Sequence, residues 1–167
     1  MPQHLKQVQM VLQGGAVKRY HSLFTVQQQT VAAHSFRVAM LALILMDSQP
    51  RAALLHAALV HDLAEAHTGD IPAQVKVALG LTERFAELEN NLLDNCGLAP
   101  LTLTVTEQRA LKLADCLDGV LFCNEEIALG NSKMLEIRER YLSYIASQGP
   151  YPSGWQNLID NVRHQNP

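Results

Sequence analysis

The spacing of apolar residues most constrains the fold, because it follows the period of an α-helix along nearly the whole chain. In the first such segment the apolar positions recur every three or four residues, at Leu5, Val8, Val11 and Leu12. Glycine and proline residues divide the segments, and the sequence shows no strand-like alternation, internal repeat or linker. This pattern predicts an all-α protein that folds as a compact, single-domain helical bundle over residues 1–167.

Residue types that begin and end helices indicate where the individual helices lie. Threonine and serine suit the position before a helix, proline suits its first turn, and glycine suits its end. These signals predict helices over about residues 5–13, 31–46, 51–64, 72–79, 82–95, 106–129, 132–148 and 155–163. Thr30, Thr106 and Ser132 are the expected starts of three of them. Residues 16–29 follow no helical pattern and are expected to be irregular.

The composition excludes several classes of protein. Of the 167 residues, 48% are hydrophobic and 17% charged, which is enough to bury a sizeable core without a disulfide framework. A disordered or collagen-like chain is excluded for the same reason. The net charge of −3 argues against nucleic acid and against an anionic membrane surface as partners. The longest uncharged apolar runs, residues 38–46 and 52–60, reach about half a membrane span.

The cysteines and the first residues bear on the compartment. Cys96, Cys116 and Cys123 are an odd number without a CxxC pair, so we interpret them as free thiols in a reducing compartment. The first twenty residues lack a basic region followed by an apolar stretch, as a secretion signal would have. We therefore expect a cytoplasmic protein.

Four polar residues stand in segments that otherwise resemble buried helix faces: His34, the pair His61-Asp62, and Asp115. Taken singly, His34 can be a hydrogen-bonded core histidine, and His61-Asp62 can open a solvated loop. Asp115 is harder to explain, because a buried carboxylate without a cation costs several kcal/mol or shifts its pKa strongly. One divalent metal bound by all four side chains explains them together. Four protein ligands leave one or two positions for water and substrate, as in a catalytic site.

The order His34, His61-Asp62, Asp115 resembles the H…HD…D signature of the HD-domain metal-dependent phosphohydrolases. The longer string over residues 61–72, HDLAEAHTGDIP, resembles the branch that contains bacterial 5'-deoxynucleotidases and phage dATP triphosphohydrolases. Residues 19–21 and 29–35 are most similar to the phage enzymes. The resemblance spans about residues 18–131 and implies the all-α bundle of the HD-domain type.

The resemblance also implies an activity. The expected function is metal-dependent hydrolysis of deoxynucleoside triphosphates, above all dATP, to deoxyadenosine plus triphosphate or stepwise phosphates. Such an enzyme would deplete dATP in the host cytoplasm for a phage that uses 2-aminoadenine. The alternative is a 5'-deoxynucleotidase that acts on deoxynucleoside monophosphates. The implied cofactor is zinc, cobalt or manganese, with a possible second divalent ion such as magnesium, and the implied assembly is a homo-oligomer, either a dimer or a hexamer.

Two further carboxylates are candidates for the chemistry itself. Glu65 follows the His61-Asp62 pair by one helical turn, and Asp70 follows a Thr-Gly turn that can fold back over the site. By resemblance they are the catalytic pair for proton transfer and for placing water or a second cation. The ordinary interpretations are an exposed helix-end charge for Glu65 and a helix N-cap for Asp70.

The remaining candidates would contact the substrate. Lys76 is the expected phosphate clamp, although a solvated surface lysine explains it equally well, and Arg19 ranks above Lys18 because guanidinium binds phosphate through two hydrogen bonds. Tyr20 is expected to stack on a purine, at a position where family members usually have tryptophan. The expected wall against C2 of adenine, which would reject 2-aminopurines, consists of Ile71, Pro72 and Val75.

Other functions are less consistent with the sequence. A cyclic-dinucleotide phosphodiesterase would need the additional histidine pairs of multi-metal relatives, which this chain lacks. A non-catalytic ligand sensor would not need Glu65, Asp70 and Lys76 together. A nucleic-acid-binding module would need a basic stripe that the sequence does not contain.

Overall fold

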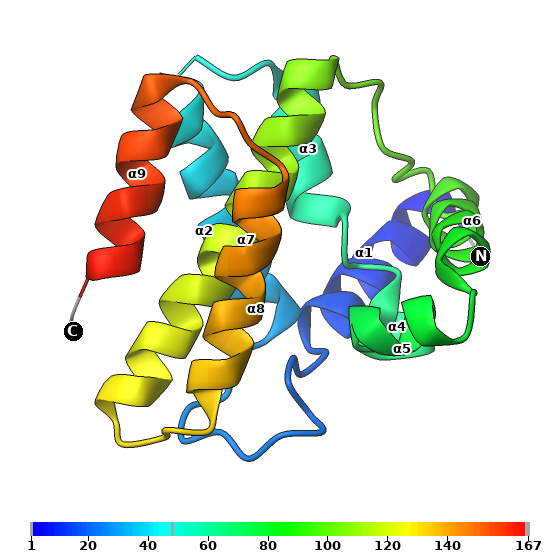
Figure 1. Cartoon of the computed structure of the whole chain (residues 1–167). Coiled ribbons are helices and arrows are strands. Elements are labelled where there is room, and N and C mark those ends of the chain that lie inside the picture. The colour runs from blue at the N-terminus through cyan, green and yellow to red at the C-terminus, as the bar shows by residue number, and fades with distance from the viewer. Residues whose placement is uncertain (1, 48, 166–167) are drawn as a thin grey trace.

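Helices dominate the computed structural model, which describes residues 2–47 and 49–165 (Figure 1). Over those residues no strand forms, and one antiparallel bridge pairs Lys18 with Thr30. The helices are α1 (Gln3–Gly15), α2 (Val31–Leu45), α3 (Ala52–Val60), α4 (Glu65–Thr68), α5 (Ala73–Ala78), α6 (Thr82–Asn95), α7 (Val105–Ala128), α8 (Met134–Ser147) and α9 (Ser153–His164). The predicted all-α fold is confirmed.

The long helix α7 is the centre of the larger core. It packs against α2 and α8, with α3 and α9 also in contact (Figure 1). The apolar side chains that these five helices share include Leu54, Leu117 and Val120, each 0% exposed. The Trp155 indole N–H donates to the backbone oxygen of Leu45 at 2.7 Å and so joins α9 to the end of α2. This bundle places α2, α3 and α7 side by side.

A second, smaller core lies beside the bundle, where α1, α4 and α6 meet the start of α2 and the end of α3. Its buried apolar residues include Met10, Val31, Leu63 and Leu93. In Figure 1, α1, α4, α5 and α6 occupy the right-hand side, whereas α9 lies on the left. The segment that follows α3 therefore runs from one core into the other.

The predicted helix over residues 51–64 is wrong over its last four residues, because α3 ends at Val60. Residues 61–64 form tight turns, in which backbone N–H groups donate to the carbonyl three residues back, for example Leu63 to Val60 at 3.1 Å and Glu65 to Asp62 at 3.0 Å. The tightening lets Leu63 and Ala64 pack against α1. The contact is so close that a Cβ on Gly14 would lie 2.5 Å from the Leu63 backbone oxygen.

The start of α2 is confirmed and the start of α7 corrected. The Thr30 side chain accepts a hydrogen bond from the Ala33 backbone N–H, as an N-cap does. The N-cap of α7 is Thr104 rather than Thr106, because Thr104 and Glu107 bond each other's backbone in a capping box. Arg51 pairs with the Glu107 carboxylate and joins the start of α3 to this cap.

Two sequence expectations concern the whole chain. Cys96, Cys116 and Cys123 are all free thiols in the structure, as predicted. Among the described residues, no helix combines the length and the apolar character needed to cross a membrane.

Candidate active site

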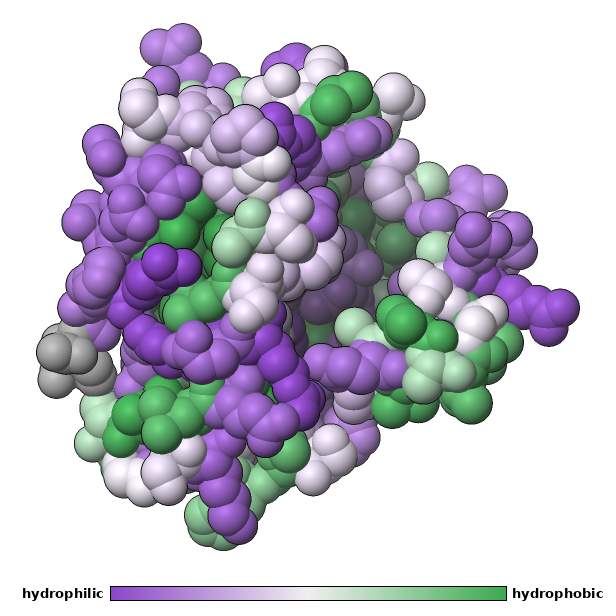
Figure 2. All heavy atoms as spheres, viewed as in Figure 1, coloured by the Kyte–Doolittle hydropathy of each residue, from purple (hydrophilic) through white to green (hydrophobic). Residues whose placement is uncertain are grey.

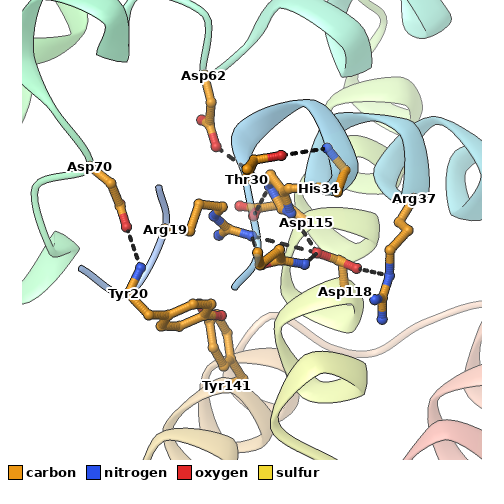
Figure 3. Close-up of polar contacts among 12 residues, drawn as sticks. Arg19, Tyr20, Thr30, His34, Arg37, Asp62, Asp70, Asp115, Asp118 and Tyr141 are labelled. Carbon is orange, nitrogen blue, oxygen red and sulfur yellow. Dashed lines mark hydrogen bonds and ion pairs between the residues drawn. The ribbon is translucent and has the colours of Figure 1, made fainter. Parts of the chain in front are cut away.

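Three segments bring the predicted metal ligands together, and Figure 3 shows three of these residues, His34, Asp62 and Asp115. His34 lies at the start of α2, His61 and Asp62 lie in the turns after α3, and Asp115 lies in the middle of α7. The Nε2 atom of His34 is 3.2 Å from Nε2 of His61. The same atom is 3.4 Å from a carboxylate oxygen of Asp62 and 3.4 Å from one of Asp115. The four side chains therefore point at one small volume.

Hydrogen bonds on the far sides of both imidazoles determine which nitrogen faces this volume. His61 Nδ1 lies 2.9 Å from the Ala58 carbonyl oxygen, so Nδ1 carries the hydrogen and donates. His34 Nδ1 lies 2.6 Å from an oxygen of Asp118, which accepts in the same way. Each Nε2 then faces the other ring. The two nitrogen atoms lie 3.2 Å apart, so they can share a proton or bind one metal ion between them.

The separations fit a shared divalent ion. Zinc binds nitrogen and carboxylate oxygen at about 2.0–2.2 Å, so neighbouring ligand atoms lie about 3–3.4 Å apart. Ligand atoms of His34, His61 and Asp115 all lie within 4.8 Å of one another, and the Asp62 oxygen is 3.4 Å from both imidazoles. The donor set of two imidazoles and two carboxylates thus suits a divalent metal with open positions.

The electrostatics of the ligands reflect their burial. Burial lowers the pKa of His34, but the contacts with Asp115 and Asp118 outweigh it and raise the pKa overall, so a metal must compete with a proton for Nε2. Burial opposes ionisation of Asp115 as well, yet the His34 contact and the Lys112 ammonium hold the pKa of that carboxyl well below its usual range. Lys112 Nζ lies 2.7 Å from the Asp115 oxygen that faces away from His34.

Glu65 begins α4 beside these ligands and is buried, with 8% of its surface exposed. One of its oxygens, Oε2, has no hydrogen-bond partner among the described residues. Burial, followed by the charges of Asp62 and Asp70, raises the pKa of Glu65 to about 9. A carboxyl group that keeps its proton at neutral pH suits acid–base chemistry.

Asp70 does not cap a helix, because α5 has Pro72 at its N-cap and no side-chain cap bond. Its carboxylate instead accepts a hydrogen bond from the Tyr20 backbone N–H at 2.9 Å (Figure 3). Tyr20 has a φ of +56°, a value unusual for a residue with a side chain. The contact holds the irregular segment 16–29 against the loop after α4.

The ring of Tyr20 has protein partners where a stacked purine was expected. It stacks on Phe122 with ring centroids 4.8 Å apart, and its hydroxyl lies 3.0 Å from that of Tyr141. The Arg19 guanidinium lies 5.4 Å from the ring centroid. Tyr20 therefore packs as a structural residue next to the site, because Phe122 already covers one face of its ring.

The predicted cations differ in how they are placed. Arg19 is buried, and its guanidinium donates to Gln29 at 3.0 Å. Lys76 pairs with Glu89 of α6 at 2.7 Å, a contact that the sequence analysis did not foresee. Lys18 is exposed, and its backbone forms the bridge to Thr30.

A cavity of about 190 Å³ opens beside the predicted metal ligand His61, and Figure 2 shows this face of the molecule hollowed between the bundle and α6. Ala57 of α3 and His61 just after it line one side, and Glu89, Asn90 and Leu93 of α6 line the other. The predicted base wall lies elsewhere. Ile71, Pro72 and Val75 are partly or fully exposed at the start of α5 and do not line this cavity.

Asp118 is the site residue that the sequence analysis missed. It is 0% exposed and lies on α7 one turn after Asp115. Its carboxylate contacts His34 and also Arg37, whose Nε lies 2.6 Å away. The available signal was a second aspartate, three residues after a predicted ligand, in an apolar helix.

Comparisons with known sequences agree with this geometry. The family model of 5'-deoxynucleotidase YfbR-like proteins matches residues 8–153. A dATP triphosphohydrolase of Salmonella phage PMBT28 is 30% identical over 152 residues, which cover 80% of this chain and 75% of the phage protein. A 5'-deoxynucleotidase of Citrobacter koseri is 29% identical over 157 residues, which cover 79% of this chain and 78% of that protein.

Solved structures share the fold. The cyanophage S-2L HD phosphohydrolase DatZ, bound to dA and one catalytic Zn²⁺ ion, has a TM-score of 0.68 at 22% identity and covers 94% of this chain and 96% of its own. A conserved hypothetical protein from Pyrococcus furiosus has a TM-score of 0.75 at 23% identity. The match covers 96% of this chain and 99% of that protein. Since the family model spans most of the chain, the protein belongs to the 5'-deoxynucleotidase YfbR-like family of HD-domain phosphohydrolases.

Proposed function

We propose that this phosphohydrolase cleaves dATP to deoxyadenosine plus triphosphate or stepwise phosphates, and that residues 1–167 act as one catalytic domain. The observation that carries the proposal is the convergence of four metal-ligand side chains from three segments beside the buried carboxyl group of Glu65. The similarity to a phage dATP triphosphohydrolase supports this choice of substrate. Such an activity would deplete dATP.

The proposed ligands are His34, His61, Asp62 and Asp115, holding one zinc, cobalt or manganese ion. Zinc is favoured, because the DatZ structure contains one catalytic Zn²⁺. When bound, such an ion supplies a Lewis acid and lowers the pKa of water toward about 7. The two neutral imidazoles orient the ion, and the two carboxylates offset its charge.

Glu65 and Asp70 are the proposed proton-transfer pair. The raised pKa of Glu65 lets it hold a proton for the oxygen atom that leaves phosphorus. Asp70 holds the Tyr20 backbone with one oxygen and can orient water with the other. These carboxylates are also the ones available to a second divalent ion such as magnesium.

The proposed phosphate contacts are Arg19 and Lys76. Lys18, the exposed neighbour of Arg19 in the irregular segment, is a further candidate. A triphosphate carries up to four negative charges, so several cations are needed. Lys76 can exchange its partner, because its ammonium is paired with Glu89 in a side chain that is still 18% exposed. Lys112 adds a further positive charge next to Asp115.

The base selection is proposed from shape. Adenine carries a hydrogen at C2, where guanine and 2-aminopurines carry an amino group, and a close apolar wall would reject the larger group by a clash. Ile71, Pro72 and Val75 remain the proposed wall, because they lie within five residues after Asp70. Tyr20 is then a support beneath the site, since its ring packs on Phe122.

The second candidate function is a 5'-deoxynucleotidase that acts on monophosphates. It is favoured by the family match and by the relatives named 5'-deoxynucleotidase from Citrobacter koseri and Shigella dysenteriae. The metal site would be the same, and the two activities would differ in how many phosphates the cations accommodate.

We further propose a cytoplasmic homo-oligomer, a dimer or a hexamer. The support is the number of apolar side chains left exposed on two helices: Leu5, Val8 and Leu12 of α1, and Phe36, Met40 and Ile44 of α2. Exposed apolar patches of this kind are typical of surfaces that another protein chain covers. Light scattering coupled to size-exclusion chromatography distinguishes dimer, hexamer and monomer directly.

The test of the activity is chromatographic product analysis with the zinc-loaded enzyme and a panel of dNTPs, NTPs and dNMPs. We expect dATP to be consumed faster than dGTP and 2-amino-dATP. Faster conversion of dAMP to deoxyadenosine would instead identify the monophosphatase. No turnover of any nucleotide in the panel would contradict both candidates.

A further inference from the structure

Asp118 is a fully buried carboxylate on which four side chains converge (Figure 3). One of its oxygens lies 2.6 Å from Nδ1 of His34, 2.8 Å from Nε2 of Gln29 and 3.5 Å from the guanidinium of Arg19. Its other oxygen lies 2.6 Å from Nε of Arg37. The partners come from α2 and from the irregular segment before it, so Asp118 joins both to α7.

Packing alone does not require a charged residue at position 118. A buried ion pair has a desolvation cost that its mutual attraction does not always repay, so an apolar residue could fill the same space. The charge does have a specific partner, because one of the two 2.6 Å contacts of Asp118 is with the ring nitrogen that lies opposite the metal-facing nitrogen of His34.

The two imidazoles are held differently. His61 donates from Nδ1 to a backbone carbonyl, that of Ala58, which no substitution of a side chain removes. His34 donates from Nδ1 to the Asp118 side chain. A change at residue 118 therefore affects one ligand and leaves the other in place.

We propose that Asp118 is the positioning residue of the metal site, and that it also positions Arg19. Its carboxylate fixes the His34 tautomer with Nδ1 protonated and Nε2 free for metal, and makes that imidazole a better ligand. The same oxygen holds the Arg19 guanidinium on the substrate side, so a metal ligand and a phosphate-binding cation share one anchor. The part that concerns Arg19 rests on the proposed function, and the part that concerns His34 does not.

The first experiment measures binding of Zn²⁺ and Co²⁺ to Asp118→Asn by competition with a chromophoric chelator. We expect affinity to fall by about 10- to 100-fold, the usual effect of losing such an outer partner. The matched control is Glu125→Gln, which breaks the pair between Glu125 and Arg37 (3.0 and 3.2 Å) on the side away from His34. Metal affinity of this control should stay within twofold of wild type. An Asp118→Asn affinity within twofold of wild type would overturn the proposal.

A spectroscopic measurement keeps the proposal testable if Asp118→Asn fails to fold. In zinc-loaded wild type with ¹⁵N-labelled histidine, His34→Gln identifies the His34 signals by their loss. We expect His34 to show a protonated Nδ1 and a metal-bound Nε2. Coordination through Nδ1, or a Nδ1 without a proton, would overturn the assignment.

The role toward Arg19 has its own readout. When wild type and Asp118→Asn are both saturated with zinc, we expect the KM of Asp118→Asn for dATP to remain about tenfold higher than that of wild type. A KM equal to that of wild type would overturn this half of the proposal. If wild type binds zinc but cleaves no deoxynucleotide, the proposed function fails, while the affinities and the histidine spectra still decide the role toward His34.

Discussion

At the scale of single residues, Glu65 is a carboxyl group in surroundings that disfavour its negative charge. Its carboxyl group is buried, and Asp62 and Asp70 place two further negative charges near it. Burial first, and these charges second, raise the pKa of Glu65 to about 9 from an ordinary value of 4.5. The folded protein therefore binds a proton between these pH values that the unfolded chain has already released.

That difference predicts how stability depends on pH. A folded-state pKa above the unfolded value contributes stability that is fully present below about pH 4.5 and is lost as pH rises toward about 9. In the chelator-treated protein, we expect the melting temperature to fall over this window. Glu65→Gln, which cannot ionise, should flatten the slope when melting is followed by circular dichroism. An equal slope in both proteins would show that Glu65 titrates normally.

The same residue gives a catalytic prediction. Glu65→Gln should retain bound zinc, because Glu65 is not among the four ligands, and should lower kcat by roughly 10²- to 10⁴-fold, as loss of an acid–base group does. Steady-state kinetics and metal analysis on one preparation check both. Unchanged kcat with full zinc would make Glu65 a structural residue.

Polar residues inside apolar helical segments were the most informative part of the sequence for predicting the site. His34 and Asp115 were predicted as ligands because polar groups in apolar helices need a shared partner, and their atoms lie 3.4 Å apart. Their role as ligands stays a prediction. The pairing of Lys76 with Glu89 and the stacking of Tyr20 on Phe122 could not be predicted. Both depend on how distant segments pack, which no local spacing records.

At the scale of helices, the break after α3 matters most for the site. In a continuous helix, successive side chains would be rotated by about 100° around the axis. The tight turns over residues 61–64 point these side chains in other directions. The turns bury Leu63 against Gly14 of α1 while His61 and Asp62 stay half-buried beside His34. Helix α1 therefore supports the two proposed metal ligands His61 and Asp62 without contributing one.

Gly14→Ala should test this support. Its Cβ would lie 2.5 Å from the Leu63 oxygen and 2.9 Å from the Leu63 Cα, both backbone atoms that cannot move aside cheaply. We expect a loss of about 1–3 kcal/mol in the free energy of unfolding, together with weaker zinc binding. The matched control is Gly154→Ala in α9, which meets nothing within 4 Å and should be neutral or stabilising by up to about 1 kcal/mol. Equal effects in chemical denaturation would contradict the close contact.

Most helices could be predicted from the sequence, and the errors lie where tertiary contacts decide. Thr30 starts α2 as predicted, because a threonine cap is a local signal. The choice of Thr104 over Thr106 for α7 was ambiguous, because both are threonines and the partner Glu107 is also bound by Arg51 from α3. The turns after Val60 depend on α1, more than 40 residues earlier in the chain.

At the scale of the whole molecule, the proposed metal ligands come from segments that belong to both cores. His34 and Asp115 come from the bundle of α2 and α7, and His61 and Asp62 come from the segment that leads to the smaller core. A bound ion would therefore stabilise the folded protein as a whole. At a concentration 100 times its Kd it adds about 2.7 kcal/mol, or about 5–10 °C in melting temperature for a chain of this size.

Metal removal tests this linkage. Chelator treatment should lower the melting temperature by that amount, and added zinc should restore it. Asp115→Ala should bind less metal, show little response to zinc and lose hydrolysis, because a ligand is missing. Full metal content and wild-type turnover in Asp115→Ala would remove Asp115 from the site.

The most direct measurement is a side-by-side chromatographic time course of zinc-loaded enzyme with dATP and with dAMP, alongside the chelator-treated enzyme. We predict that deoxyadenosine forms from dATP faster than from dAMP, and that the chelator abolishes both reactions until zinc is restored. Deoxyadenosine formed faster from dAMP would contradict dATP as the preferred substrate, and turnover that survives complete metal removal would contradict a metal-dependent site at His34, His61, Asp62 and Asp115.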